Sequence, residues 1–155
     1  MSVLLYTTQE IKFEYTFAAG DAFTAKDAMN YAFLGDTAVP LWITPTLNVA
    51  GGSPISTGDP VQIFCSYGQL AQHDIDTYVR WVMIPGGNDI WTIHFPNDSS
   101  SGQQIPLGQQ FVLWNQGKSL ALCPKDGNFC GLGTAEAPWG FTASAVSSSV
   151  PAPER

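Results

Sequence analysis

Few residues of this chain have the type and spacing that a chemical site requires. The sequence contains only two histidines, and His73 lies in a short loop with Asp74 and Asp76. An imidazole beside two carboxylates offers ligands to a metal ion, but this loop lacks the ligand spacing of a known metal site. The pattern favours a solvated loop, so the sequence predicts no metal and no other cofactor.

Catalytic motifs are also missing from the sequence. It contains no Gly-x-Ser-x-Gly, no glycine-rich phosphate loop, no HExxH and no pair of CxxC motifs. The second histidine, His94, alternates with apolar residues, which is typical of an edge or core position in a β-strand. We therefore predict no catalytic residue and do not expect an enzyme.

Composition limits the class of partner. Apolar residues make up 45% of the 155 residues and charged residues only 12%, which is enough apolar material for the core of one domain. The net charge of −7 argues against nucleic acid and anionic membranes as partners. The N-terminal residues lack the positive and long apolar segments of a secretory signal, so we expect a cytoplasmic protein. The low charge is compatible with an apolar face that pairs two copies, so a homodimer remains an alternative to a monomer.

The three cysteines do not form an evident disulfide framework. Cys65, Cys123 and Cys130 are odd in number, although the last two are close enough in sequence to pair across one loop. Buried free thiols are the favoured interpretation.

An internal repeat of about fifty residues organises the chain. Residues 52–63 recur as residues 102–113, with glycines and apolar residues in the same places. Leu5 lies fifty residues before Ile55, and Ile105 lies fifty residues after it, so these three residues form one equivalent set. We expect these three side chains to form a layer of the core.

A tryptophan follows near the end of each repeat and provides a second marker. These residues are Trp42, Trp91 and Trp139. Because two markers share one period, an internal threefold repeat is the leading hypothesis. The three tryptophans are predicted to form another layer of the core.

Alternation of apolar and polar residues predicts four short strands in each repeat and no helix. Three such units bury their apolar faces only by closing around a common axis, which predicts a β-trefoil, with an irregular β-sandwich as the rival. One domain over residues 1–143 is expected, with repeats at about 1–50, 51–100 and 101–143 and a flexible tail at 144–155. The strands are predicted at residues 10–17, 22–25, 31–34, 39–44, 61–65, 69–72, 78–84, 90–95, 111–114, 119–122, 129–132 and 139–142.

Over residues 1–143 the threefold pattern and the tryptophan of the fourth strand resemble β-trefoil proteins. Residues 136–142, with the sequence Glu-Ala-Pro-Trp-Gly-Phe-Thr, are similar to the Trp-x-Phe-Thr ending of mycocypins. The resemblance points to two groups of small fungal proteins: protease inhibitors of the mycocypin and cocaprin type, and mushroom lectins. For an inhibitor it implies a reversible, non-covalent block of papain-like cysteine proteases, with pepsin-like aspartic proteases as a second target.

The loops favour an inhibitor, because their sequences diverge while the core positions repeat. A protease inhibitor needs one or two loops that differ from their symmetry mates and enter an extended cleft. Small residues at 18–21 would enter a narrow cleft without a clash, together with the loop at 26–30 or its mate at 124–128. The predicted protease-binding residues are Ala18, Ala19, Gly20, Asp21, Lys26, Asp27, Lys125, Asp126, Gly127 and Asn128.

A carbohydrate-binding lectin is the alternative. The Gln-x-Trp motif of ricin-type lectins fails in all three repeats, where the glutamine position holds Pro40, Asp89 and Ala137. Three aspartates at roughly equivalent positions would accept hydrogen bonds from sugar hydroxyls, although aspartate is equally a turn residue. They are Asp27, Asp74 and Asp126.

Two further tryptophans bear on the lectin hypothesis. Trp81 and Trp114 would offer aromatic faces on which a sugar stacks, but packing within their own strands is the favoured prediction.

Overall fold

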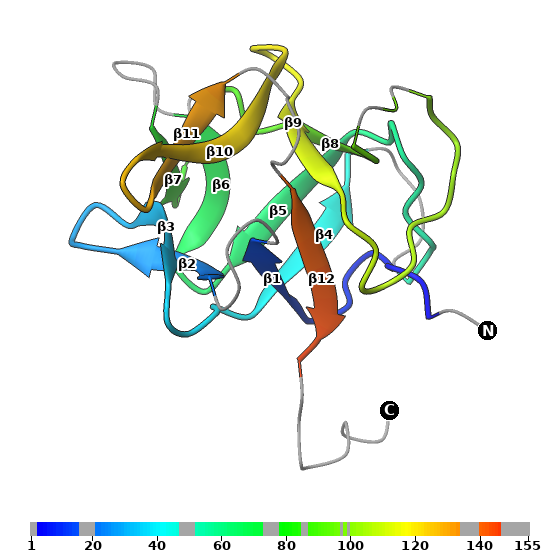
Figure 1. The fold of residues 1–155 in the computed structure, drawn as a ribbon, viewed down its shortest axis with the longest axis horizontal. Helices are drawn as coiled ribbons and strands as arrows, with labels where there is room; N and C mark the ends of the chain where they lie inside the picture. The colour runs from blue at the N-terminus through cyan, green and yellow to red at the C-terminus, as the bar shows by residue number, and fades with distance from the viewer. Residues whose placement is uncertain are drawn as a thin grey trace.

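The computed structural model describes residues 3–15, 21–46, 52–72, 78–84, 87–96, 98, 100–133 and 140–146. Within these ranges the chain forms twelve β-strands and no helix, which confirms the predicted all-β class (Figure 1). The described residues include no helix whose length and apolarity would suffice to span a bilayer.

Four strands fall in each predicted repeat. Buried and more exposed residues alternate along half of the twelve strands, as period-2 patterning requires. The strands are β1 (Ile11–Tyr15), β2 (Asp21–Lys26), β3 (Tyr31–Gly35), β4 (Leu41–Pro45), β5 (Val61–Cys65), β6 (Gly68–Gln72), β7 (Val79–Val82), β8 (Trp91–His94), β9 (Val112–Asn115), β10 (Leu120–Asp126), β11 (Phe129–Gly133) and β12 (Phe141–Ala145).

Six of these strands pair in a closed ring. Strand β1 pairs with β4, β4 with β5, β5 with β8 and β8 with β9. A bridge between Phe111 and Phe141 joins the start of β9 to β12, which pairs with β1 and closes the ring. Closure leaves no open edge in this part of the sheet.

The other six strands form three hairpins, β2–β3, β6–β7 and β10–β11 (Figure 1). Single residue pairs connect the hairpins to one another: Tyr31 with Arg80, Phe129 with Phe33, and Tyr78 with Gly131. The hairpins therefore support each other beside the ring.

The three repeats make the same backbone hydrogen bond at corresponding positions. In each repeat an N–H near the entrance to the first strand donates to a carbonyl in the fourth strand of the same repeat. The bonds are Thr8 to Ile43 at 2.8 Å, Gly58 to Ile93 at 3.1 Å and Gly108 to Ala143 at 2.9 Å. Donors and acceptors thus recur with the spacing of about fifty residues that the sequence shows.

The first predicted core layer is confirmed. Leu5, Ile55 and Ile105 are all buried. They lie in one apolar cluster with the inward-facing residues of the ring strands.

The predicted tryptophan layer is wrong at Trp42, although Trp91 is buried as predicted. Leu41, Trp91 and Phe141 occupy the equivalent buried positions of the fourth strands. Trp42 is one residue out of step and therefore faces outward, because neighbouring residues of a strand point to opposite faces. Its ring stacks on Phe64 with centroids 6.3 Å apart. The third tryptophan, Trp139, lies outside the described residues.

Strand β7 is shorter than predicted and has no polar face. Val79, Arg80 and Trp81 are all buried, since both faces of this hairpin strand are covered. Beyond its end the side chains of Met83 and Ile84 are 79% and 89% exposed, although the sequence predicts strand there.

Two other boundaries differ from the sequence prediction. Strand β10 continues to Asp126 with a register shift after Pro124, where the sequence predicts a turn at 124–128. A bulge of this kind lets pairing continue past a proline. Strand β12 pairs with β1 as far as Ala145, two residues beyond the predicted domain boundary.

Candidate functional site

Hairpins β2–β3 and β10–β11 lie side by side. Phe33 pairs with Phe129, and their ring centroids are 4.9 Å apart in an edge-to-face contact. The N–H of Leu34 donates a hydrogen bond to the carbonyl of Asn128 at 2.9 Å. This contact holds the tip of β10–β11 against β3.

A hollow of about 440 Å³ opens between these hairpins, and we call it the hairpin hollow. Lys26 and Asn128 both line it, although the sequence nominated their loops as alternatives. The Lys26 ammonium lies 5.0 Å from the centre of the Phe33 ring, which is a cation–π distance. The lining residues are Thr24, Ala25, Lys26, Phe33, Leu34, Gly35, Asp36 and Asn128.

The tip of β2–β3 is an ordered turn that projects one apolar side chain. Asp27 and Asn30 have positive φ angles of 69° and 55°, and the Asn30 N–H donates to the Asp27 carbonyl at 3.0 Å. The Asn30 carbonyl accepts a hydrogen bond from the Trp81 N–H at 2.9 Å, which ties the turn to β7. Between these two residues the side chain of Met29 is 51% exposed.

The other predicted protease-binding residues are placed only in part. Asp21 begins β2 and Lys125 is an exposed residue of β10, whereas the loop residues Ala18, Ala19 and Gly20 lie outside the described residues.

Two of the three aspartates of the lectin alternative, Asp27 and Asp126, are described, and they occupy different positions in their hairpins. Asp27 takes the left-handed conformation at its hairpin tip, but the β10–β11 tip places that conformation on Gly127, with a φ angle of 61°. Asp126 belongs to strand β10 instead, and Asp74 lies outside the described residues. For Asp27 the geometry fits the ordinary role of aspartate in a turn.

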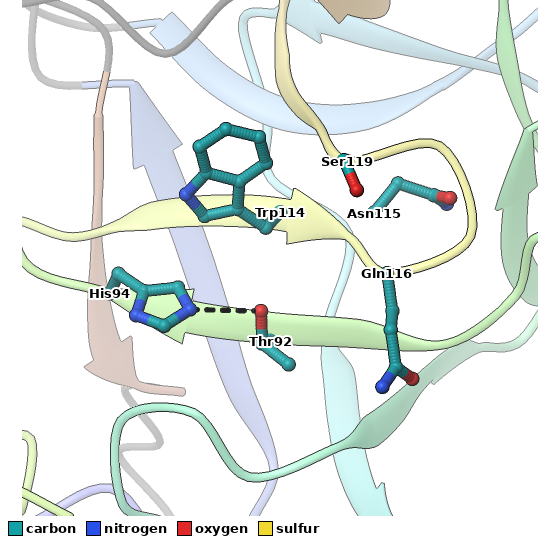
Figure 2. A pocket seen from close by; sticks show the side chains of 6 residues that line it. All are labelled: Thr92, His94, Trp114, Asn115, Gln116 and Ser119. Carbon is teal, nitrogen blue, oxygen red and sulfur yellow. Dashed lines mark hydrogen bonds between the residues drawn. The ribbon is translucent and has the colours of Figure 1, made fainter. Parts of the chain in front are cut away.

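A second hollow, of about 350 Å³, lies on β8, β9 and the turn that follows β9, and we call it the tryptophan hollow. Figure 2 shows Thr92 and His94 on β8, Trp114 on the neighbouring β9, and Gln116 and Ser119 on the turn. Its lining residues are Thr92, His94, Trp114, Asn115, Gln116 and Ser119.

Strand register places these side chains together. Thr92 lies directly opposite Trp114 on the neighbouring strand, and both face outward because Ile93 and Leu113 face the core. His94 is half-buried on the same outward face, so it is neither a core histidine nor at a strand edge. Its Nε2 atom lies 3.1 Å from the Thr92 hydroxyl oxygen (Figure 2).

Asp98 is an exposed carboxylate whose pKa is lowered mainly by hydrogen bonds. Hydrogen bonds from the hydroxyl and N–H of Ser100 lower the pKa of Asp98, and the charge of His94 lowers that pKa further. The first of these contacts measures 2.6 Å between oxygens.

Buried Asn115 holds the turn beside Trp114. Its side-chain amide donates to the Asn88 carbonyl at 2.8 Å, and its side-chain oxygen accepts from the Lys118 N–H at 3.1 Å. Its backbone carbonyl accepts from the Ser119 N–H at 2.8 Å. Three hydrogen bonds from one residue make this turn a fixed part of the hollow rather than a loose loop.

Sequence reasoning did not find the tryptophan hollow as a site. Trp114 was one of two tryptophans offered as stacking faces, and the structure separates them. Trp81 is buried, whereas Trp114 is half-buried and faces the hollow. The signal in the sequence was the alternation around Trp114, which places it on the outward face.

The three cysteines are free thiols, and all are buried. Burial raises the pKa of Cys123 to about 11 and also raises the pKa values of Cys65 and Cys130. A raised pKa keeps a thiol protonated and a poor nucleophile. The cysteines therefore offer no reactive group at either hollow.

No family model matches the sequence, and no curated protein matches it by sequence either. The fold is similar to that of the SDF2-like protein from Arabidopsis thaliana, with a TM-score of 0.69 and 11% identity over 96% of this chain and 100% of that chain. It is also similar to the lysenin pore, with a TM-score of 0.68 and 11% identity over 94% of this chain. This chain spans about half of the lysenin chain, 48% of its length.

A third similar structure is the Kunitz-type cysteine protease inhibitor PCPI-3 from potato. Its TM-score is 0.59, with 12% identity over 94% of each chain. At such low identity these similarities concern the fold alone, which is all-β and β-trefoil-like.

Proposed function

We propose that this protein is a reversible, non-covalent inhibitor of papain-like cysteine proteases, and that its fold is a β-trefoil. The pairings support the fold assignment, since six strands form a closed ring and the other six form three hairpins. The inhibitor surface would be the adjoining tips of β2–β3 and β10–β11.

The arrangement of the β2–β3 tip carries this proposal. An inhibitor loop must stay in one conformation while it enters the cleft, because ordering a loose loop on binding costs affinity. The hydrogen bond from Trp81 to Asn30 and the one inside the turn hold this tip in place. The neighbouring tip is held in the same way through Leu34 and Asn128.

Met29 supplies the apolar contact that such a loop needs. Its side chain is half-exposed at the outermost part of the turn, so a protease cleft would bury it without rearranging the inhibitor. Binding energy at protein interfaces concentrates in a few side chains that become buried at the centre of the contact. Lys26, whose ammonium lies over the Phe33 ring, adds a positive charge to the same hairpin.

Two other observations are consistent with this function. The potato protein with a similar fold is, by its printed description, a cysteine protease inhibitor. The three thiols of this chain are buried, so a covalent exchange with the protease cysteine is not the mechanism we propose. Inhibition would instead depend on shape and burial at the two tips.

The test is a papain inhibition assay with the full chain, with pepsin assayed beside it as a representative aspartic protease. We expect inhibition of papain at low micromolar concentration or better. Met29→Glu should weaken it by about tenfold or more, because a charge would be buried in an apolar contact. Met83→Glu is the matched control, since Met83 is another exposed methionine but lies outside both tips.

The outcomes separate the function from its location. Absence of papain inhibition by the unchanged protein would overturn the inhibitor proposal. Equal weakening by both methionine variants, or by neither, would remove the β2–β3 tip from the proposed surface. Ala19→Trp then tests the predicted loop at 18–21, where bulk should weaken inhibition if that loop enters the cleft.

A further inference from the structure

We propose that the tryptophan hollow binds a neutral sugar ring, which stacks on the indole of Trp114. This activity would be separate from protease inhibition, because the tryptophan hollow and the hairpin hollow share no lining residue. The proposal rests on the chemistry of the lining, on the strand register and on a comparison of the three repeats.

The polar groups around the hollow suit hydroxyl groups. The hydroxyls of Thr92 and Ser119 and the amide of Gln116 each provide both a hydrogen-bond donor and an acceptor. A sugar hydroxyl has the same double capacity, so it can pair with any of them. Among the described residues that line the hollow, His94 is the one ionisable side chain, and its Nε2 atom lies 3.1 Å from the Thr92 hydroxyl oxygen. These residues include no carboxylate, lysine or arginine, which favours a neutral ligand over a phosphate, a sulfate or a cation.

The aromatic group completes this lining. Trp114 is half-buried, so part of its indole remains open in the hollow. One face of a sugar ring carries C–H groups and is apolar, whereas its rim carries hydroxyls. An exposed indole covers such an apolar face, and the surrounding polar groups then fix the orientation of the ring.

The three repeats carry different residues at this pair of neighbouring strand positions. The pair formed by Thr92 and Trp114 corresponds to the pair of Trp42 and Phe64, and also to the pair of Thr142 and Glu14. In the first equivalent, Trp42 stacks on the aromatic ring opposite it at an interplanar angle of 12°. In the second, neither residue is aromatic.

Because Thr92 is small, part of the Trp114 indole remains uncovered, whereas the equivalent pair in the first repeat places a second aromatic ring there. The turn beside it is fixed by the hydrogen bonds of Asn115. A hollow of about 350 Å³ is large enough for one sugar ring.

The experiment begins with a glycan array on the full chain. The free sugars glucose, galactose, mannose and N-acetylglucosamine, together with the best array hit, are then titrated while the indole N–H signals are followed by NMR. We expect at least one neutral glycan to bind and to move the Trp114 signal saturably. Trp114→Ala should weaken this binding by about tenfold or more.

Two further variants separate a binding site from a folding defect. Thr92→Trp keeps the Trp114 indole but should fill the hollow, as Trp42 covers Phe64, and so should abolish binding. Trp42→Ala removes the outward tryptophan at the equivalent position of the first repeat and should leave glycan affinity unchanged. Thermal unfolding of each variant checks that the fold is retained.

Three results would overturn the proposal. They are silence of the whole array and all free sugars, binding that persists in both Trp114→Ala and Thr92→Trp, and binding only to sulfated or sialylated glycans. Papain inhibition measured on Trp114→Ala reports on the other function separately, and it should be unchanged.

Discussion

The hydroxyl oxygen of Thr7 accepts a hydrogen bond from the backbone N–H of Ser53, in the next repeat, at 3.1 Å. Thr57 makes the same contact with the N–H of Gln103, also at 3.1 Å. Both threonines are buried, and the equivalent residue of the third repeat is Leu107, which has no hydroxyl. Two of the three junctions between repeats therefore carry a side-chain hydrogen bond.

Thr7→Val should lower the free energy of unfolding by about 1–2 kcal/mol, because it removes a buried hydrogen bond while keeping nearly the same shape. Urea denaturation measures the change. Thr46→Val is the control, since the exposed Thr46 hydroxyl bonds the Pro60 carbonyl and its loss should cost about 0.5 kcal/mol or less. Equal losses of unfolding free energy in the two variants would show that the Thr7 bond stabilises the protein no more than the exposed Thr46 bond does.

Trp91→Ala should destabilise the protein by about 3–5 kcal/mol, because the indole is fully buried and its removal leaves a large cavity. Its Nε1 also donates to the Leu70 carbonyl at 2.9 Å, and Trp91→Phe removes this bond while keeping one aromatic ring, so it should cost less than Trp91→Ala. Trp42→Ala should cost distinctly less, since Trp42 is outside the core. Chemical denaturation of all three variants tests the corrected core layer, and a larger cost at Trp42 would contradict it.

Gly68→Ala should be strongly destabilising. Gly68 has a φ angle of 143°, and a Cβ atom there would lie 2.4 Å from the Val82 carbonyl oxygen. Gly87 has a similar φ angle of 135°, but among the described residues, its chain neighbours aside, no atom lies within 4 Å of the same position. Gly87→Ala therefore carries the backbone strain without the clash. Melting temperatures should fall further for Gly68→Ala, and matching decreases would show that strain alone accounts for both.

The buried thiols predict both a reactivity pattern and a pH dependence. A maleimide should label the native protein slowly and all three cysteines after denaturation, because burial keeps the thiolate from forming. Labelling of only one cysteine in the denatured, unreduced protein would reveal a disulfide that the structure lacks.

The sign of the pH effect follows from the raised pKa of Cys123. The unfolded thiol ionises near its ordinary pKa of 9.0, whereas the folded thiol holds its proton until about 11. Folding stability from this residue is therefore intact below pH 9.0 and declines as the pH rises toward 11. Urea denaturation across this window should show a smaller loss for Cys123→Ser than for the unchanged protein.

Local pattern predicted much of the fold. Alternation along β5, Val61–Cys65, and the repeated positions of Leu5, Ile55 and Ile105 depend on neighbours within one strand or one repeat, so they are readable from the sequence. The tryptophan marker failed because Trp42 and Trp91 do not occupy equivalent positions in their strands; the equivalent of Trp91 is Leu41. A shift of one residue moved Trp42 to the outer face, and only the pairing of strands decides such a register.

For the candidate surfaces, too, the sequence names individual residues, but strand pairing decides which of them lie together. The sequence named Lys26 and Asn128 as parts of separate loops, but the single pairing of Phe33 with Phe129 brings those loops to one hollow. The site at Trp114 depends on Thr92, a residue more than twenty positions away that no motif connects to it.

By itself, then, the sequence determined the strand class, the threefold repeat and one layer of the core, because these follow from periodicity along the chain. Only the tertiary structure decided which residue lies opposite each outward tryptophan. Trp42 is stacked on Phe64 and Trp114 faces Thr92, and this difference arises from the residue that strand pairing places opposite each ring. Such partners are set by contacts between distant segments, which local sequence does not encode.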